Sequence, residues 1–146
     1  MLADMEYLIP ALTDVARAAN AIIAALPVSS QAVVLALHGD LGAGKTTFVQ
    51  TLAVQLGIPD TVTSPTFVIM KSYHTEDEVF DTLVHIDAYR IEGSDEMRPL
   101  RFADILATAS TLVCIEWAER IEDLLPAHTI HLTFTGNDDA RTIVVS

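Results

Sequence analysis

One glycine-rich segment of the chain combines residue types that could bind the phosphates of a nucleotide. Residues 39–46 read Gly39-Asp40-Leu41-Gly42-Ala43-Gly44-Lys45-Thr46 and fit the pattern G-x-x-x-x-G-K-[ST]. Glycine permits positive φ and lets backbone N–H groups approach phosphate oxygens with no Cβ in the way. In this pattern Lys45 would reach the β- and γ-phosphates, and the Thr46 hydroxyl would bind Mg²⁺. A glycine-rich turn without a ligand is the alternative.

The residues around this segment predict a strand before it and a helix after it. Residues 33–37 form an apolar, partly β-branched run that is typical of a buried strand. After the segment, Phe48, Leu52 and Leu56 recur at helical spacing, and Gly57 is a helix stop signal. A helix that begins there directs its free N–H groups and positive dipole end at an anion. We therefore expect these residues to contact a nucleotide: Gly39, Asp40, Gly42, Ala43, Gly44, Lys45, Thr46 and Thr47.

Two carboxylates stand at the ends of predicted strands. Asp87 ends the apolar run 82–87, and Glu116 follows the apolar run 111–115. Open α/β sheets bind ligands at the carboxyl ends of their strands, so these acids would converge on the glycine-rich segment if the strands are parallel neighbours. Acids at such a place favour metal binding or water activation. Asp87 could instead be a helix cap or turn residue, and the pattern does not decide which acid would orient a water.

A histidine and a hydroxyl-rich segment are two further candidates whose sequence patterns do not by themselves predict a function. His85 alternates with apolar residues of its strand, which favours a packed histidine over a ligand. The segment Thr63-Ser64-Pro65-Thr66 carries three hydroxyls around a proline. It could order on a γ-phosphate as a nucleotide-sensing loop, or it could be an ordinary Ser-Pro turn into a strand at 67–70.

The remaining elements complete an α/β pattern. We expect an edge strand at 7–9, a helix with Thr13 as its N-cap that ends at Pro27, and an acidic hairpin tip at 76–78. A short helix through 102–106, a helix at 118–125 and a terminal hairpin of strands 129–135 and 141–145 follow. The prediction is an α/β fold of the P-loop NTPase type, with three layers and a central, mostly parallel sheet that has antiparallel edge strands.

Composition limits the classes of function. The chain has 146 residues, of which 51% are hydrophobic, and we expect one domain over residues 1–146. We see neither a secretory signal nor a run long enough to span a membrane, and Cys114 is the only cysteine, so we expect a cytoplasmic location. The net charge of −12 leaves no basic footprint, which argues against direct binding of DNA or RNA and is compatible with a basic protein partner.

Among small P-loop proteins, two common classes lack their motifs here. A GTPase would carry Asn-Lys-x-Asp, which is absent, and an Asp-x-x-Gly that Asp87-Ala88-Tyr89-Arg90 does not supply. A kinase usually has an arginine-rich lid, and the six arginines of this chain are scattered. A minimal ATPase remains. A kinase acting on a small-molecule acceptor and a nucleotide-gated interaction module stay open as alternatives.

Four linked motifs resemble those of one family. They are residues 39–48, Thr63-Ser64-Pro65-Thr66-Phe67, His85-Ile86-Asp87-Ala88-Tyr89-Arg90 and Glu116-Trp117-Ala118-Glu119. Their order and spacing resemble the TsaE (YjeE) family of bacterial ATPases. The resemblance implies ATP hydrolysis together with the proteins TsaB and TsaD. It also implies a role in forming N6-threonylcarbamoyladenosine at position 37 of tRNAs that read codons beginning with A, with tRNA contacted through the complex.

The resemblance also implies roles for individual residues. Lys45 would bind phosphate, Thr46 and Glu116 would bind Mg²⁺, and Asp87 would lie on the Mg²⁺ and γ-phosphate side of ATP or ADP. Trp117 would flank the site, and Thr13 and Arg141 would be weaker nucleotide contacts. In one segment the chain departs from the family, because it reads Glu96-Met97-Arg98-Pro99-Leu100 where members often carry a Leu-Gly pair.

Overall fold

The structure, a computed structural model, describes residues 5–9, 12–27, 29–39, 44–59, 62–63, 69–136 and 141–146, without the side chains of Leu12 and Thr13. Asp40, Gly42, Ala43 and the segment 64–68 lie outside these ranges, so what the sequence predicts for them stays a prediction. None of the helices in the described ranges has the length and apolar character needed to span a bilayer.

The described residues form one seven-stranded sheet whose middle strands are parallel. The strands are β1 (Met5–Ile9), β2 (Val33–His38), β3 (Met70–His74), β4 (Thr82–Asp87), β5 (Thr111–Glu116), β6 (Ile130–Gly136) and β7 (Arg141–Val145). Their order across the sheet is β1-β7-β6-β2-β5-β4-β3. β2 pairs in parallel with β5 and β6, and β4 pairs in parallel with β5. β3, β7 and β1 are added antiparallel at the edges, as the sequence predicts.

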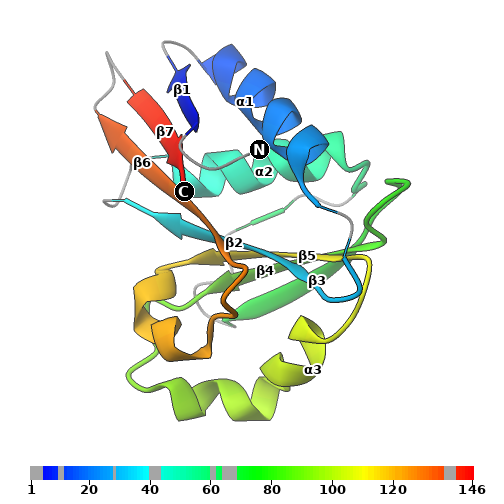
Figure 1. The fold of residues 1–146 in the computed structure, drawn as a ribbon, viewed down its shortest axis with the longest axis vertical. Coiled ribbons are helices and arrows are strands. Elements are labelled where there is room, and N and C mark those ends of the chain that lie inside the picture. The colour runs from blue at the N-terminus through cyan, green and yellow to red at the C-terminus, as the bar shows by residue number, and fades with distance from the viewer. Residues whose placement is uncertain are drawn as a thin grey trace.

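Helices cover both faces of the sheet (Figure 1). On one face lie α1 (Leu12–Ala25) and α2 (Lys45–Gln55). On the other lie α3 (Phe102–Leu106) and two 3₁₀ helices, η1 (Ser94–Leu100) and η2 (Ala118–Leu124). The alternation of side chains along buried strands supplies apolar surface to both layers. In β2, Leu35 and Leu37 join the apolar cluster under α1 and α2, whereas Val34 and Ala36 join the cluster under the opposite helices.

The strand register brings the two predicted acids together beside the end of β2. Leu37 pairs with Glu116, and Asp87 also pairs with Glu116, so β5 lies between the other two strand ends. The carboxyl ends of β2, β4 and β5 therefore meet at one edge of the sheet, which confirms the expectation that they are parallel neighbours. Gly39 follows β2 directly.

Most element predictions are confirmed to within two residues, and two need correction. α1 begins at Leu12, so Thr13 lies inside its first turn and is not the N-cap. A threonine is tolerated in the first turn, because the backbone N–H groups of that turn have no partner within the helix. The strand expected at 67–70 is Met70–His74 instead, because Ile69 has φ 66 and so leaves the extended conformation just before it. The short helix expected at 102–106 is confirmed as α3, and the structure adds η1 before it, with Arg101 at φ 56 between the two.

Candidate functional site

The start of α2 has no capping side chain on its backbone N–H groups. Gly44 is its N-cap in the left-handed conformation, with φ 102, and it supplies no side-chain cap. The first turn of α2 also contains no acidic residue. Its leading N–H groups are therefore not satisfied by a capping side chain, and together with the helix dipole they favour a negatively charged ligand.

Lys45, the first residue of α2, is held over the end of β2. The residue is only 5% exposed, and its Nζ donates a hydrogen bond of 2.5 Å to the carbonyl oxygen of Gly39. The same Nζ lies 4.3 Å from the centroid of the Trp117 ring. Both of these contacts are with uncharged groups. If an anion reached Nζ, Nζ would exchange its neutral acceptor for a charged one, with which it forms a stronger hydrogen bond.

Thr46, one residue further along α2, is joined to the acid at the end of β5. The Thr46 hydroxyl donates to Oε1 of Glu116 over 2.9 Å. The other carboxylate oxygen, Oε2, lies 2.7 Å from Nε2 of His85 on the neighbouring strand β4. Glu116 is 4% exposed, so two hydrogen bonds hold a nearly buried carboxylate beside the start of α2.

Asp87 and Trp117 lie at the same edge of the sheet as Glu116. Asp87 is 5% exposed, and its Oδ1 accepts a hydrogen bond of 2.9 Å from the backbone N–H of Tyr89. The ring of Tyr89 packs against that of Trp117 with centroids 5.1 Å apart. Trp117 directly follows β5 with φ 59, a strained conformation for a bulky residue. In this conformation the face of its ring lies under Nζ of Lys45.

Arg141 lies beside Gly44, the N-cap of α2. It begins β7, and a Cβ built on Gly44 would stand 3.5 Å from its Nη1. The guanidinium is therefore beside the N-terminus of α2. Thr47 and Arg141 also line a small hollow with Val15 of α1 and Phe134 of β6.

The structure thus gathers most of the residues that the sequence singles out. Gly39, Gly44, Lys45, Thr46, Asp87, Glu116 and Trp117 stand at the carboxyl ends of β2, β4 and β5 or at the start of α2, with Thr47 and Arg141 beside Gly44. Thr13 is in the first turn of α1, and its side chain lies outside the described part.

His85 is the residue whose contact the sequence reasoning missed. Its predicted burial is confirmed at 0% exposure, but its hydrogen bond to Glu116 was not foreseen. The signal was present in the alternation of the strand. His85 stands two residues before Asp87 and so points to the same face of β4. That face carries the predicted site.

These observations fit a nucleotide with Mg²⁺. A cation, a glycine N-cap and an uncapped helix start are the groups that phosphate oxygens need. The Thr46 hydroxyl and the Glu116 carboxylate place oxygens side by side, and oxygens are the ligands that Mg²⁺ prefers. Mg²⁺ is usually held by only a few protein oxygens together with phosphate and water.

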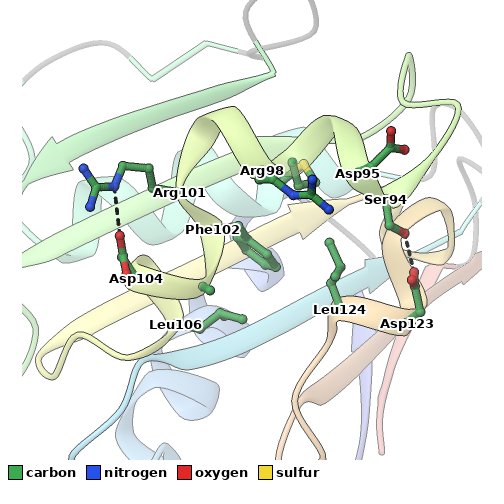
Figure 2. Close-up of a pocket in the computed structure, with 11 residues that line it drawn as sticks. Ser94, Asp95, Arg98, Arg101, Phe102, Asp104, Leu106, Asp123 and Leu124 are labelled. Carbon is green, nitrogen blue, oxygen red and sulfur yellow. Dashed lines mark hydrogen bonds and ion pairs between the residues drawn. The ribbon is translucent and has the colours of Figure 1, made fainter.

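A larger cavity lies elsewhere, on the opposite helical layer (Figure 2). It measures about 670 Å³ and is lined by residues of η1, α3 and η2. Met97, Phe102 and Leu124 form part of its apolar wall, and the ion pair between Arg101 and Asp104 stands at one end. None of the site residues that the sequence predicts lines this cavity.

Comparison with known proteins agrees with the four motifs. The family model described as threonylcarbamoyl adenosine biosynthesis protein TsaE matches residues 9–143. The tRNA threonylcarbamoyladenosine biosynthesis protein TsaE of Bacillus subtilis (strain 168) is 42% identical over 111 residues, covering 75% of this chain and 66% of that protein. The protein of the same name from Treponema pallidum is 41% identical over 104 residues, covering 68% and 70%.

Two further likenesses extend over more of the chain. The protein of the same name from Haemophilus influenzae is 32% identical over 115 residues, covering 79% of this chain and 70% of its own length. The crystal structure of YdiB from Bacillus subtilis superposes with a TM-score of 0.72 at 28% identity, covering 100% of this chain and 87% of that one. The sequence matches thus span about two thirds of each relative's own length. The chain belongs to the TsaE family of threonylcarbamoyladenosine biosynthesis proteins.

Proposed function

We propose that this protein is a P-loop ATPase that binds ATP with Mg²⁺ and hydrolyses it in partnership with TsaB and TsaD. In that assembly it would serve the formation of N6-threonylcarbamoyladenosine at position 37 of tRNAs that read codons beginning with A. The observation that carries the proposal is the meeting of Lys45, Thr46 and Glu116 where α2 begins. The relatives, which are named as threonylcarbamoyladenosine biosynthesis proteins, supply the pathway.

In this proposal each residue has a separate task. Lys45 leaves the carbonyl of Gly39 and donates to β- and γ-phosphate oxygens, while the N–H groups at the start of α2 bind the same phosphates. Thr46 and Glu116 hold Mg²⁺, which when bound neutralises charge on the phosphate oxygens. Asp87 stands at the end of the neighbouring strand, where it pairs in register with Glu116. At this place it would orient the attacking water, either directly or through the metal.

The reaction is a hydrolysis that needs no covalent enzyme intermediate. The oxygen of a water forms a bond to the γ-phosphorus as the bond from that phosphorus to the β–γ bridging oxygen breaks. The electron pair of the broken bond stays with ADP, and inorganic phosphate carries the oxygen from water. What the protein contributes is position and charge stabilisation.

Reconstitution with purified TsaB, TsaD, tRNA and ATP tests this function, with modified adenosine and released phosphate measured together. Lys45→Ala should abolish both signals because phosphate binding loses its cation. Arg101→Asn is the matched control, because it also removes a cation but lies 81% exposed beside the distant cavity. Asparagine also tolerates the positive φ of that position. Unchanged phosphate release by Lys45→Ala would contradict the site assignment.

A variant that binds ATP without hydrolysing it distinguishes this ATPase from a nucleotide-gated interaction module. Asp87→Asn keeps the size of the side chain and removes its charge, so we expect ATP binding to persist and phosphate release to fall. If that variant still supports modification of tRNA, binding of ATP is sufficient and hydrolysis is incidental.

A further inference from the structure

The carboxylate of Glu116 is held from two sides by residues of two different elements. Thr46 of α2 donates to Oε1 over 2.9 Å, and Nε2 of His85 on β4 lies 2.7 Å from Oε2. His85 is completely buried, and the side chain of Glu116 is 5% exposed. An ionised carboxylate can only accept hydrogen bonds, so the proton between His85 and Glu116 belongs to Nε2.

The strand register explains why His85 reaches this carboxylate. β4 and β5 are parallel neighbours in which His85 pairs with Cys114 and Asp87 pairs with Glu116. Residues two apart on a strand share a face, so His85 and Asp87 point to the same side of β4, and Cys114 and Glu116 to the same side of β5. Leu83 and Cys114 belong to the apolar cluster under α1 and α2. His85 therefore lies in that apolar layer and contacts Glu116 diagonally across the strand pair.

The surroundings of His85 indicate that the imidazole is present for its hydrogen bond to Glu116. Its other ring nitrogen, Nδ1, is buried, and no group in the described part of the chain lies within hydrogen-bonding distance of it. A buried polar atom without a partner costs free energy that a leucine at the same place would avoid. The hydrogen bond from Nε2 to a carboxylate is charge-assisted, and it is the compensating interaction.

We propose that His85 is a positioning residue that holds the Glu116 carboxylate in the orientation in which Oε1 faces Thr46. This inference rests on the proposed function, in which Thr46 and Glu116 together receive the Mg²⁺ of the nucleotide. Without the bond to Oε2, the carboxylate can rotate about its side-chain torsions and turn Oε1 away from Thr46. Groups that orient metal-ligating side chains in this way commonly contribute 10- to 100-fold to metal affinity.

Two substitutions at His85 separate its hydrogen bond from its volume. His85→Gln places an amide N–H where Nε2 stands, whereas the shorter side chain of His85→Asn places its amide near Nδ1 and cannot reach Glu116. Leu83→Ala is the control for lost stability, because Leu83 is fully buried on the same face of β4 and makes no polar contact. Calorimetry measures ADP affinity with and without Mg²⁺, and thermal unfolding monitors the fold of each variant.

We expect Mg²⁺ to strengthen ADP binding to the wild-type protein. In His85→Asn the factor by which Mg²⁺ strengthens ADP binding should fall by about 10- to 100-fold, whereas His85→Gln should retain most of it. Leu83→Ala should unfold at lower temperature and keep the wild-type ratio of the two affinities. The inference is overturned if folded His85→Asn keeps that ratio, if Leu83→Ala loses it equally, or if His85→Gln fails as His85→Asn does.

Proton–nitrogen NMR of the nucleotide-free protein tests the hydrogen bond by itself. The wild type should show a downfield, slowly exchanging imidazole N–H from Nε2 of His85, and Glu116→Ala should lose it. An unchanged signal in Glu116→Ala would overturn the inference even where nucleotide binding is intact. If the wild type binds no nucleotide, the proposed function fails, and the NMR result still decides whether His85 holds Glu116.

Discussion

Thr46 is the residue at which the helix and the sheet of the site are joined. Its hydroxyl hydrogen-bonds Glu116, which in turn contacts His85, so α2, β5 and β4 meet in one chain of polar contacts. Lys45 beside it has a different kind of neighbourhood, with a carbonyl oxygen and an aromatic face. The proposed phosphate contact and the proposed metal contact thus belong to adjacent residues with different surroundings, and substitution can separate them.

Replacing Thr46 by valine should weaken nucleotide binding only where Mg²⁺ takes part. Valine keeps the shape of the side chain but removes the hydroxyl, so we expect the gain in ADP affinity from Mg²⁺ to fall by about 10- to 100-fold. Affinity in the presence of a chelator should change little. Calorimetry in both conditions measures the two affinities.

Thr51→Val is the matched control for this substitution. Thr51 lies on the same helix, and its hydroxyl donates to the carbonyl of Thr47 in the preceding turn. Its loss should leave the effect of Mg²⁺ unchanged. Equal weakening of Thr46→Val with and without Mg²⁺ would count against a metal-binding role for Thr46.

At the scale of elements, the end of α2 depends on a glycine that packs against the β3–β4 hairpin. Gly57 has φ 74, and a Cβ built on it would stand 2.8 Å from the Cβ of Glu76. Gly57→Ala should therefore lower the free energy of unfolding by about 1–2 kcal/mol from the backbone alone, with the close contact adding to the loss. Urea denaturation measures it. Gly93→Ala is the control, because Gly93 has φ −150 and its one close neighbour is the mobile end of Asp95. A loss in Gly57→Ala no larger than in the control would refute this explanation.

The parallel strands β2 and β6 carry two histidines in contact, His38 and His131, from which we expect a dependence of stability on pH. Nε2 of His38 lies 2.8 Å from Nδ1 of His131, so one nitrogen must donate and the other accept. Burial, and then the charge of His38, lower the pKa of His131, while Glu122 opposes them. The folded protein then binds fewer protons near this site than the unfolded chain does. The contribution to stability is present above the unfolded pKa of about 6.5 and is lost as pH falls through the lowered folded pKa.

Replacement of His131 tests this dependence. Asparagine can still hydrogen-bond His38 but does not titrate, so His131→Asn should lose less stability than the wild type between pH 7.5 and 5.5. Thermal unfolding at a series of pH values measures the difference between the two slopes. Parallel curves for the two proteins would show that His131 does not contribute to the pH dependence.

The sequence predicts this site only where its signals are local. Asp87 and Glu116 each end an apolar run, so their placement follows from the rule that ligands bind at the carboxyl ends of parallel strands. The contact between His85 and Glu116 depends on the register of β4 against β5, and this register cannot be predicted from the sequence of either strand alone. The break at Arg101 is equally hidden, because arginine gives no signal for positive φ.

At the scale of the whole molecule, charge limits what the protein can do alone. The chain carries 20 acidic residues against 8 lysines and arginines. Phosphoryl transfer spreads negative charge over the γ-phosphate oxygens, and that charge must be neutralised in the transition state. Lys45 and Mg²⁺ supply part of this neutralisation in the proposed site. A strongly acidic surface is also suited to receive a basic partner, which can bring a further cation to the same edge of the sheet.

We therefore expect slow ATP hydrolysis by the isolated protein and faster hydrolysis with its partners. An arginine supplied in trans raises such rates by about 10³- to 10⁵-fold, so an increase of this order on adding TsaB and TsaD would indicate that a partner completes the site. Phosphate release at saturating ATP, measured with each partner singly and with both, gives the comparison. Lys45→Ala should stay at background in every mixture, because a partner's cation cannot replace the one that first binds the phosphates. A wild-type rate indifferent to both partners would mean that the site is complete within this chain and that its acidic surface serves another purpose.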